Sequence, residues 1–143
     1  MSKRPAVTTA ALFSTLAIGI ACLSPLRTHA QNSTRVFEIR TYTAPEGKLD
    51  ALKARFRDHT IDIFNRHGMT SIGYWVPQDS PKSQNTLIYI IAHPSRDAAR
   101  QHWREFAADP EWKKVAAESE ANGKIVDHIE SVFVDPTDFS PIK

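Results

Sequence analysis

The stretch VFEIRTY, residues 36–42, determines how the rest of the chain is interpreted. Its side chains fall into two alternating sets, one mostly apolar and one carrying charge: Phe37, Ile39 and Thr41 against Val36, Glu38, Arg40 and Tyr42. Alternation with a period of two predicts a β-strand. Unpaired charges are costly to bury. We therefore expect the charged set on the sheet face opposite the helices, where it meets water, pairs within itself or meets a partner sheet.

The residues after this strand predict a helix and then two more strands. Over 48–67 the apolar positions recur every three or four residues, as in an amphipathic helix, and Gly68 ends it. Alternation predicts a second strand over 69–76, followed by a polar turn. The run TLIYIIA, residues 86–92, is almost wholly apolar and β-branched, which favours a central strand.

The second half of the domain repeats the pattern of helix and strand. Ser95 is a suitable N-cap for a helix, and Asp109-Pro110 restarts that helix as a shorter one to about residue 121. The last strand falls within 125–134. The order strand, helix, strand, strand, helix, strand indicates an α+β, ferredoxin-like βαββαβ sandwich. We place this domain at 36–138, after a flexible leader at 31–35 and before a C-terminal tail at 139–143.

The first 30 residues have the pattern of an export signal. A basic start, an apolar stretch and Thr28-His29-Ala30 predict cleavage after Ala30 and a periplasmic or secreted protein. Two alternatives are a retained membrane anchor and a lipid on Cys22, the only cysteine. Cleavage would leave a chain without disulfides or thiolate chemistry and without stable membrane insertion.

The charge of the chain after Ala30 argues against polyanionic partners. The full sequence has a net charge of +2, but three of its basic residues precede the cleavage point, which leaves −1. A nearly neutral domain lacks the basic patch typical of nucleic-acid or anionic-membrane binding. We expect neither partner.

Several motifs together resemble the NIPSNAP family. The strand opening Glu38-x-Arg40-x-Tyr42 is followed by Gly47-Lys48-Leu49, by His67-Gly68, and by a strand with Gly73 and Trp75; Asp109-Pro110-Glu111-Trp112 continues the likeness. The resemblance covers nearly all of residues 36–138. It implies a dimeric α/β barrel, in which two ferredoxin-like sheets pack face to face, and so a homodimer through the face bearing Glu38, Arg40 and Tyr42. It implies no particular reaction.

Five residues are candidate ligand-binding groups. Arg40 and Tyr42 offer a cation and a phenol to an anionic or oxygenated molecule, and the alternative is a structural ion pair across a dimer interface. His59 projects beside Phe56 on the helix stripe that faces the sheet. His93 follows the buried strand, where it caps either a pocket or only the strand. Trp75 and Tyr74 lie on opposite faces of their strand, so one of them faces the lumen or interface.

The sequence lacks several familiar catalytic patterns. It contains no glycine-rich phosphate loop, nucleophile elbow or paired carboxylates at catalytic spacing, which disfavours a conventional hydrolase or nucleotide enzyme. Haem ligation by His59 or His67 has no supporting second motif, and no zinc spacing occurs, so we expect no cofactor and no metal.

Two classes of function remain for the domain. One is a protein that binds a small aromatic or anionic ligand in a pocket between sheet and helices, with or without chemistry of the cofactor-free monooxygenase or isomerase kind. The other is a non-enzymatic dimeric interaction module. A cavity lined by Arg40, Tyr42, His59 and His93 would favour the first class, and a filled interior would favour the second.

Overall fold

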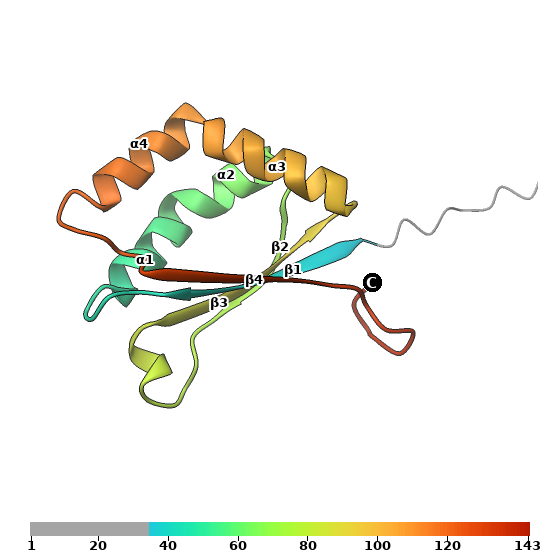
Figure 1. Cartoon of the computed structure of the whole chain (residues 1–143), viewed down its shortest axis with the longest axis horizontal. Helices are drawn as coiled ribbons and strands as arrows, with labels where there is room; N and C mark the ends of the chain where they lie inside the picture. Colours follow the sequence, from blue (N-terminus) through green and yellow to red (C-terminus); the bar gives the residue numbers. More distant parts are fainter. Residues whose placement is uncertain (1–34) are drawn as a thin grey trace, which may run out of the picture. The chain divides into compact units, whose positions relative to one another are not determined.

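The computed structural model describes residues 35–143, and it has a four-stranded antiparallel sheet with helices on one face (Figure 1). In chain order the elements are β1 (Val36–Thr43), α1 (Leu49–Arg55), η1 (Phe56–Thr60), α2 (Ile61–Arg66), β2 (Thr70–Trp75), η2 (Lys82–Gln84), β3 (Thr86–His93), α3 (Arg96–Ala108), α4 (Pro110–Ser119) and β4 (His128–Val134). The predicted signal, its cleavage point and Cys22 lie outside the described residues. Within 35–143, no helix has both the length and the apolar character needed to cross a membrane.

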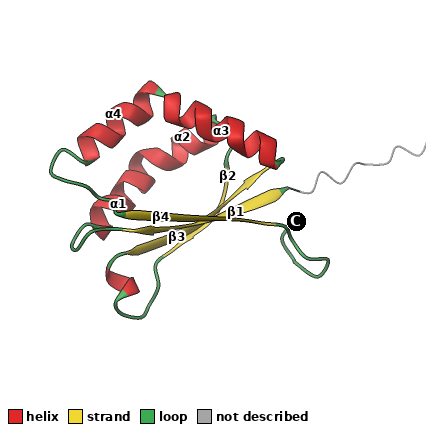
Figure 2. Cartoon of the chain, viewed as in Figure 1, coloured by secondary structure: helices red, strands yellow, loops and turns green. Residues whose placement is uncertain are grey.

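The strands lie in the order β2-β3-β1-β4, with β1 antiparallel to both of its neighbours. Arg40 in β1 is opposite Tyr89 in β3 and Ser131 in β4. Figure 2 shows α1, α2, α3 and α4 on the same side of this sheet. The mixed α+β, ferredoxin-like fold predicted from the order of elements is confirmed.

The expected orientation of β1 is wrong, although its alternation is right. Glu38 and Tyr42 are buried beneath the helices, and Arg40 lies between them. The opposite, apolar set of side chains faces away from the helices. The Glu38 carboxylate can be buried on the helix side because polar groups from α3, β4 and β3 contact it there.

The first helix is continuous but contains one wider turn. The segment η1 is a π-helix between α1 and α2, and the hydroxyl of Thr60 donates to the carbonyl of Arg55 over 3.1 Å. The extra residue in that turn shifts the phase of the helix. Thr60 is buried in line with Phe56 and Phe64, whereas His59 is exposed, so the expectation that His59 lies on the stripe facing the sheet is wrong.

The helical caps are those expected from the sequence. Ser95 caps α3 by accepting from the amide of Ala98, and Asp109 caps α4 by accepting from the amides of Glu111 and Trp112. Gly68 ends the first helix with a φ of 72°, in the left-handed region that favours glycine. These caps fix the chain on either side of the buried polar cluster described next.

Candidate functional site

A buried carboxylate lies at the centre of the polar cluster between the sheet and α3. One oxygen of Glu38 accepts from the Arg40 guanidinium and the Ser131 hydroxyl, each over 2.6 Å. The other oxygen accepts from the Trp103 indole over 2.6 Å and lies 3.4 Å from Nε2 of His93. Burial alone would raise the pKa of Glu38, but contacts from His93, Ser131, Trp103 and Arg40 lower it from 4.5 to about 2. Glu38 is thus held as an anion and is a poor general base near neutral pH.

Arg40 contacts three side chains of its own chain, although its Nε atom is buried without a hydrogen-bond partner among the described residues. Besides its ion pair with Glu38, it donates to the Tyr42 hydroxyl over 3.4 Å, and its guanidinium carbon lies 4.2 Å from the ring centre of Trp103. Burial alone would lower the pKa of Arg40, but Tyr89, Tyr42 and Glu38 raise it above its usual value. The ion pair is internal to one strand and lies beneath α3, so the expectation that the face bearing Glu38, Arg40 and Tyr42 meets a partner sheet is wrong.

Two histidines extend the cluster toward the surface. Nδ1 of His93 lies 3.1 Å from Nδ1 of His102, so one ring donates a proton to that contact and the other accepts it. If His93 accepts there, its own proton is at Nε2 and faces Glu38. Burial, and then the neighbouring His93, lower the pKa of His102.

A hollow of about 200 Å³, partly open to solvent, lies beside the cluster, between the sheet and the helices. Five aromatic side chains contribute to its lining: Tyr42, Phe56, Phe64, Phe106 and Trp112. Neighbouring rings among them meet mostly edge to face or at a tilt, as in a packed aromatic core. The remaining lining residues include the polar Arg55, Thr60 and Glu120. We call this space the inner cavity.

Arg55 is the buried cation of the inner cavity. Its guanidinium donates to Glu120 over 3.1 Å and to Ser119 over 3.3 Å, and it lies over the ring of Trp112. Its Nε atom is buried and has no hydrogen-bond partner among the described residues. An unpaired buried donor is costly unless a ligand or water accepts from it.

The five predicted site residues occupy different places. Only Tyr42 lines the inner cavity, with Arg40 one hydrogen bond behind it. His93 belongs to the Glu38 cluster, and His59 lies in a separate hollow between η1 and α4. The structure therefore does not bring Arg40, Tyr42, His59 and His93 together around one space.

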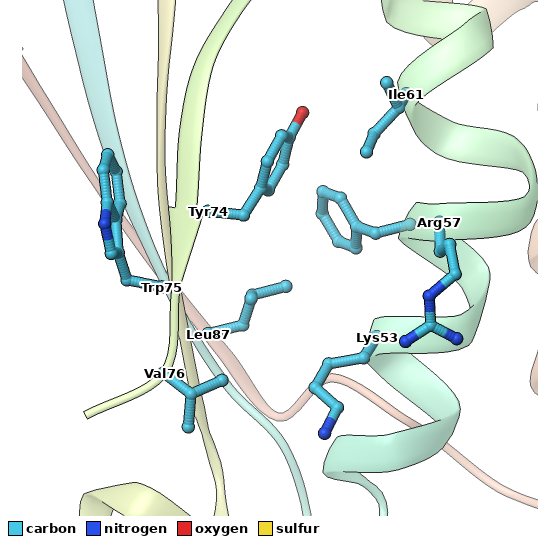
Figure 3. A pocket seen from close by; sticks show the side chains of 8 residues that line it. Lys53, Arg57, Ile61, Tyr74, Trp75, Val76 and Leu87 are labelled. Atoms are coloured by element: carbon cyan, nitrogen blue, oxygen red, sulfur yellow. The ribbon is translucent and has the colours of Figure 1, made fainter. Parts of the chain in front are cut away.

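Trp75 borders a groove between β2 and the first helix, but its indole points away from that groove (Figure 3). Figure 3 shows its indole on the opposite side of β2 from Tyr74. The ring lies against Gly73, where a Cβ would be 2.6 Å from the indole, so a larger residue at this position would displace the indole. Trp75 is 49% exposed.

Sequence reasoning missed three residues of the inner cavity: Arg55, Thr60 and Glu120. The available signal was Arg55 itself, a charged residue next to Phe56 on the apolar stripe of the helix. Thr60 also lies on that stripe, four residues from both Phe56 and Phe64. Within residues 35–143, no three His, Cys, Asp or Glu side chains converge in a way that could hold a metal ion.

Comparisons with known proteins agree with this fold. Residues 37–141 match the model of the NIPSNAP family. A NIPSNAP family protein of unknown function from Agrobacterium tumefaciens is 25% identical with a TM-score of 0.67, over 78% of this chain and 96% of that one. A NIPSNAP-like domain protein from Burkholderia xenovorans is 17% identical with a TM-score of 0.66, over 76% and 90%.

A more distant likeness concerns the fold alone. SnoaB, a cofactor-independent oxygenase from Streptomyces nogalater, is 17% identical with a TM-score of 0.50, over 76% of this chain and 98% of that one. No curated protein matches the sequence significantly.

Proposed function

The chain belongs to the NIPSNAP family, and on that premise we propose that its domain binds a small aromatic molecule with an oxygen or anionic substituent in the inner cavity. The observation that carries this proposal is an aromatic cavity of about 200 Å³ with a buried guanidinium in its wall. Ligand sites are typically apolar hollows with a few polar groups that fix orientation.

Different lining residues contact different parts of the proposed ligand. The aromatic rings offer faces and edges to a planar ligand. Arg55 offers its unpaired Nε proton to an oxygen, and its charge favours an anionic one. Tyr42 accepts from Tyr89 over 3.1 Å and from Arg40, which leaves its own hydroxyl proton free to donate to a ligand. Arg40 then acts through Tyr42 rather than by direct contact.

Chemistry on the bound ligand is the finer part of this proposal. The fold likeness to SnoaB, a cofactor-independent oxygenase, makes cofactor-free monooxygenase-type or isomerase-type chemistry the reaction class to test. Tyr42 is the residue placed to donate a proton to a ligand oxygen. Oxygen uptake and product analysis with dihydroxynaphthalenes would detect an oxygenase, and binding without turnover would indicate a binding protein.

The binding proposal is tested by filling the cavity. Ala116 lines it from α4, so Ala116→Leu should abolish binding of 2-naphthol, measured by calorimetry, while the circular dichroism spectrum is kept. Ala107→Leu, on the exposed side of α3, is the matched control and should bind normally. Undiminished binding by Ala116→Leu would overturn the proposal.

A second candidate function rests on the sheet face that no described helix covers. Register places Ile39, Ile88, Ile90 and Val132 on this outer face, and Val132 is 57% exposed. We propose that a second copy of the chain covers it, as the dimeric barrel implied by the family resemblance requires. An interaction module would work through this surface, and both activities can coexist in one periplasmic or secreted homodimer.

A further inference from the structure

The groove between β2 and the first helix is separate from the inner cavity and larger than it. It has a volume of about 320 Å³, within the range of small-molecule sites. Its lining consists of Lys53, Phe56, Arg57, Ile61, Tyr74, Trp75, Val76 and Leu87. Phe56 is the one described residue that lines both the groove and the inner cavity, so its ring forms a common wall between them.

The groove is divided into an apolar wall and a cationic rim. Phe56, Tyr74 and Leu87 form the wall, and the hydroxyl of Tyr74 is already bonded to Ser71 over 2.7 Å, so Tyr74 offers mainly its ring. Lys53 and Arg57 are four residues apart and therefore lie on one face of the helix. Figure 3 shows their charged ends at the same end of the groove, across from Val76.

Both rim cations are available to a ligand. Lys53 pairs with Asp50 over 2.7 Å, but that carboxylate is 92% exposed, and such surface pairs contribute little. Arg57 is exposed, and no carboxylate within residues 35–143 lies within 4.0 Å of its guanidinium. A single anionic group placed between them would gain two charge-assisted contacts.

We propose that this groove binds an amphipathic monoanion: a carboxylate held by Lys53 and Arg57, with a ring or short alkyl body against Phe56, Tyr74 and Leu87. A neutral ligand of the same shape would leave both cations unused. A small inorganic anion would leave the apolar wall in contact with water. The site uses different cations from the inner cavity and shares only the Phe56 ring with it, so it can take a ligand of its own.

The test compares 2-naphthoate with its neutral analogue 2-naphthalenemethanol on the full-length protein. We expect naphthoate to bind at least tenfold more tightly by calorimetry, and to weaken in 0.5 M salt because the cations are exposed. Octanoate is the second arm, and its affinity relative to naphthoate tells whether the preferred body is alkyl or aryl. Amide chemical shifts should change at Tyr74 and Leu87.

The matched variants separate specific contacts from net charge. Lys53→Gln with Arg57→Gln should lose about tenfold in naphthoate affinity, whereas Lys113→Gln with Lys114→Gln, on the exposed side of α4, changes the charge equally and should lose nothing. Equal binding of the neutral analogue, or equal loss in both double variants, would overturn the proposal.

The outcome is distinguishable from that of the proposed function. Ala116→Leu fills the inner cavity and should leave naphthoate binding in the groove intact. Shift changes confined to Thr60 and Ala116 would assign naphthoate to the inner cavity and refute the groove site.

Discussion

Glu38 shows how a charged residue can be a structural anchor. Its carboxylate has donors from β1, β3, α3 and β4, so one side chain ties three strands to a helix. Because the folded pKa of about 2 is below the usual 4.5, the ionised form stabilises the fold above about pH 5. That contribution, about 3 kcal/mol at 1.36 kcal/mol per pKa unit, is lost as the pH falls from about 5 to about 2.

We therefore predict that Glu38→Gln lowers the free energy of unfolding by about 3 kcal/mol at pH 7, because it leaves the Arg40 cation without its counter-charge. Urea unfolding at pH 7, 5 and 3 measures this. The difference between variant and wild type should shrink as the pH falls. Glu46→Gln, at an exposed position, is the control and should change stability by less than about 0.5 kcal/mol. A pH-independent difference would contradict the assignment.

The cost of removing one charge of the Glu38–Arg40 pair can be compared with the cost of removing both. Arg40→Met alone leaves Glu38 buried with fewer donors and should cost about 3–5 kcal/mol, whereas Arg40→Met with Glu38→Leu should cost less, since neither charge then lacks a partner. Melting curves of the two variants give the comparison. If the double variant also binds 2-naphthol normally, Arg40 has no part in holding the ligand through Tyr42.

At the scale of elements, the caps are the most predictable feature. Ser95→Ala should lower the free energy of unfolding by about 1 kcal/mol, because the amide of Ala98 loses its acceptor. Ser95→Asp restores an acceptor and is the matched control. Chemical denaturation of both variants checks the prediction, and an alanine variant as stable as wild type would show that the cap contributes nothing.

The elements also show where sequence reasoning stops. The period of two in residues 36–42 and the run at 86–92 give the strands, because periodicity is a local property. The side of the sheet that the helices cover is not local: it depended on donors from Trp103, Ser131 and His93, which are distant in sequence. The π-turn is likewise invisible to a helical period of 3.6, and His59, which lies within it, is exposed.

For the whole molecule, the apolar outer face of the sheet predicts a homodimer. A stable dimer should bury on the order of 1,600 Å² in total. Val132→Glu places a charge on that face, so we expect a dimer to become a monomer by light scattering at micromolar concentration. Lys114→Glu, on the exposed side of α4, is the control and should leave the mass unchanged. A wild-type monomer would remove the dimer proposal.

Export is also a property of the whole chain. The basic start, apolar stretch and Thr28-His29-Ala30 predict that protein from the native host begins at Gln31. Intact-mass measurement checks this directly. A mass that includes Met1, or an added lipid on Cys22, would support one of the two alternatives instead.

The three tryptophans lie in different parts of the domain, so the fluorescence of each reports on its own surroundings. Trp103 donates to Glu38, Trp112 lines the inner cavity, and the indole of Trp75 lies on the outer face of the sheet, beside Ile88 (Figure 3). The half-exposed indole should emit at longer wavelength than the two more enclosed ones, and Trp75→Phe should shift the emission maximum to the blue. A change in the red-edge emission would then report that the outer face has been covered, and quenching that survives Trp75→Phe would report the cavity, without any label added to the protein.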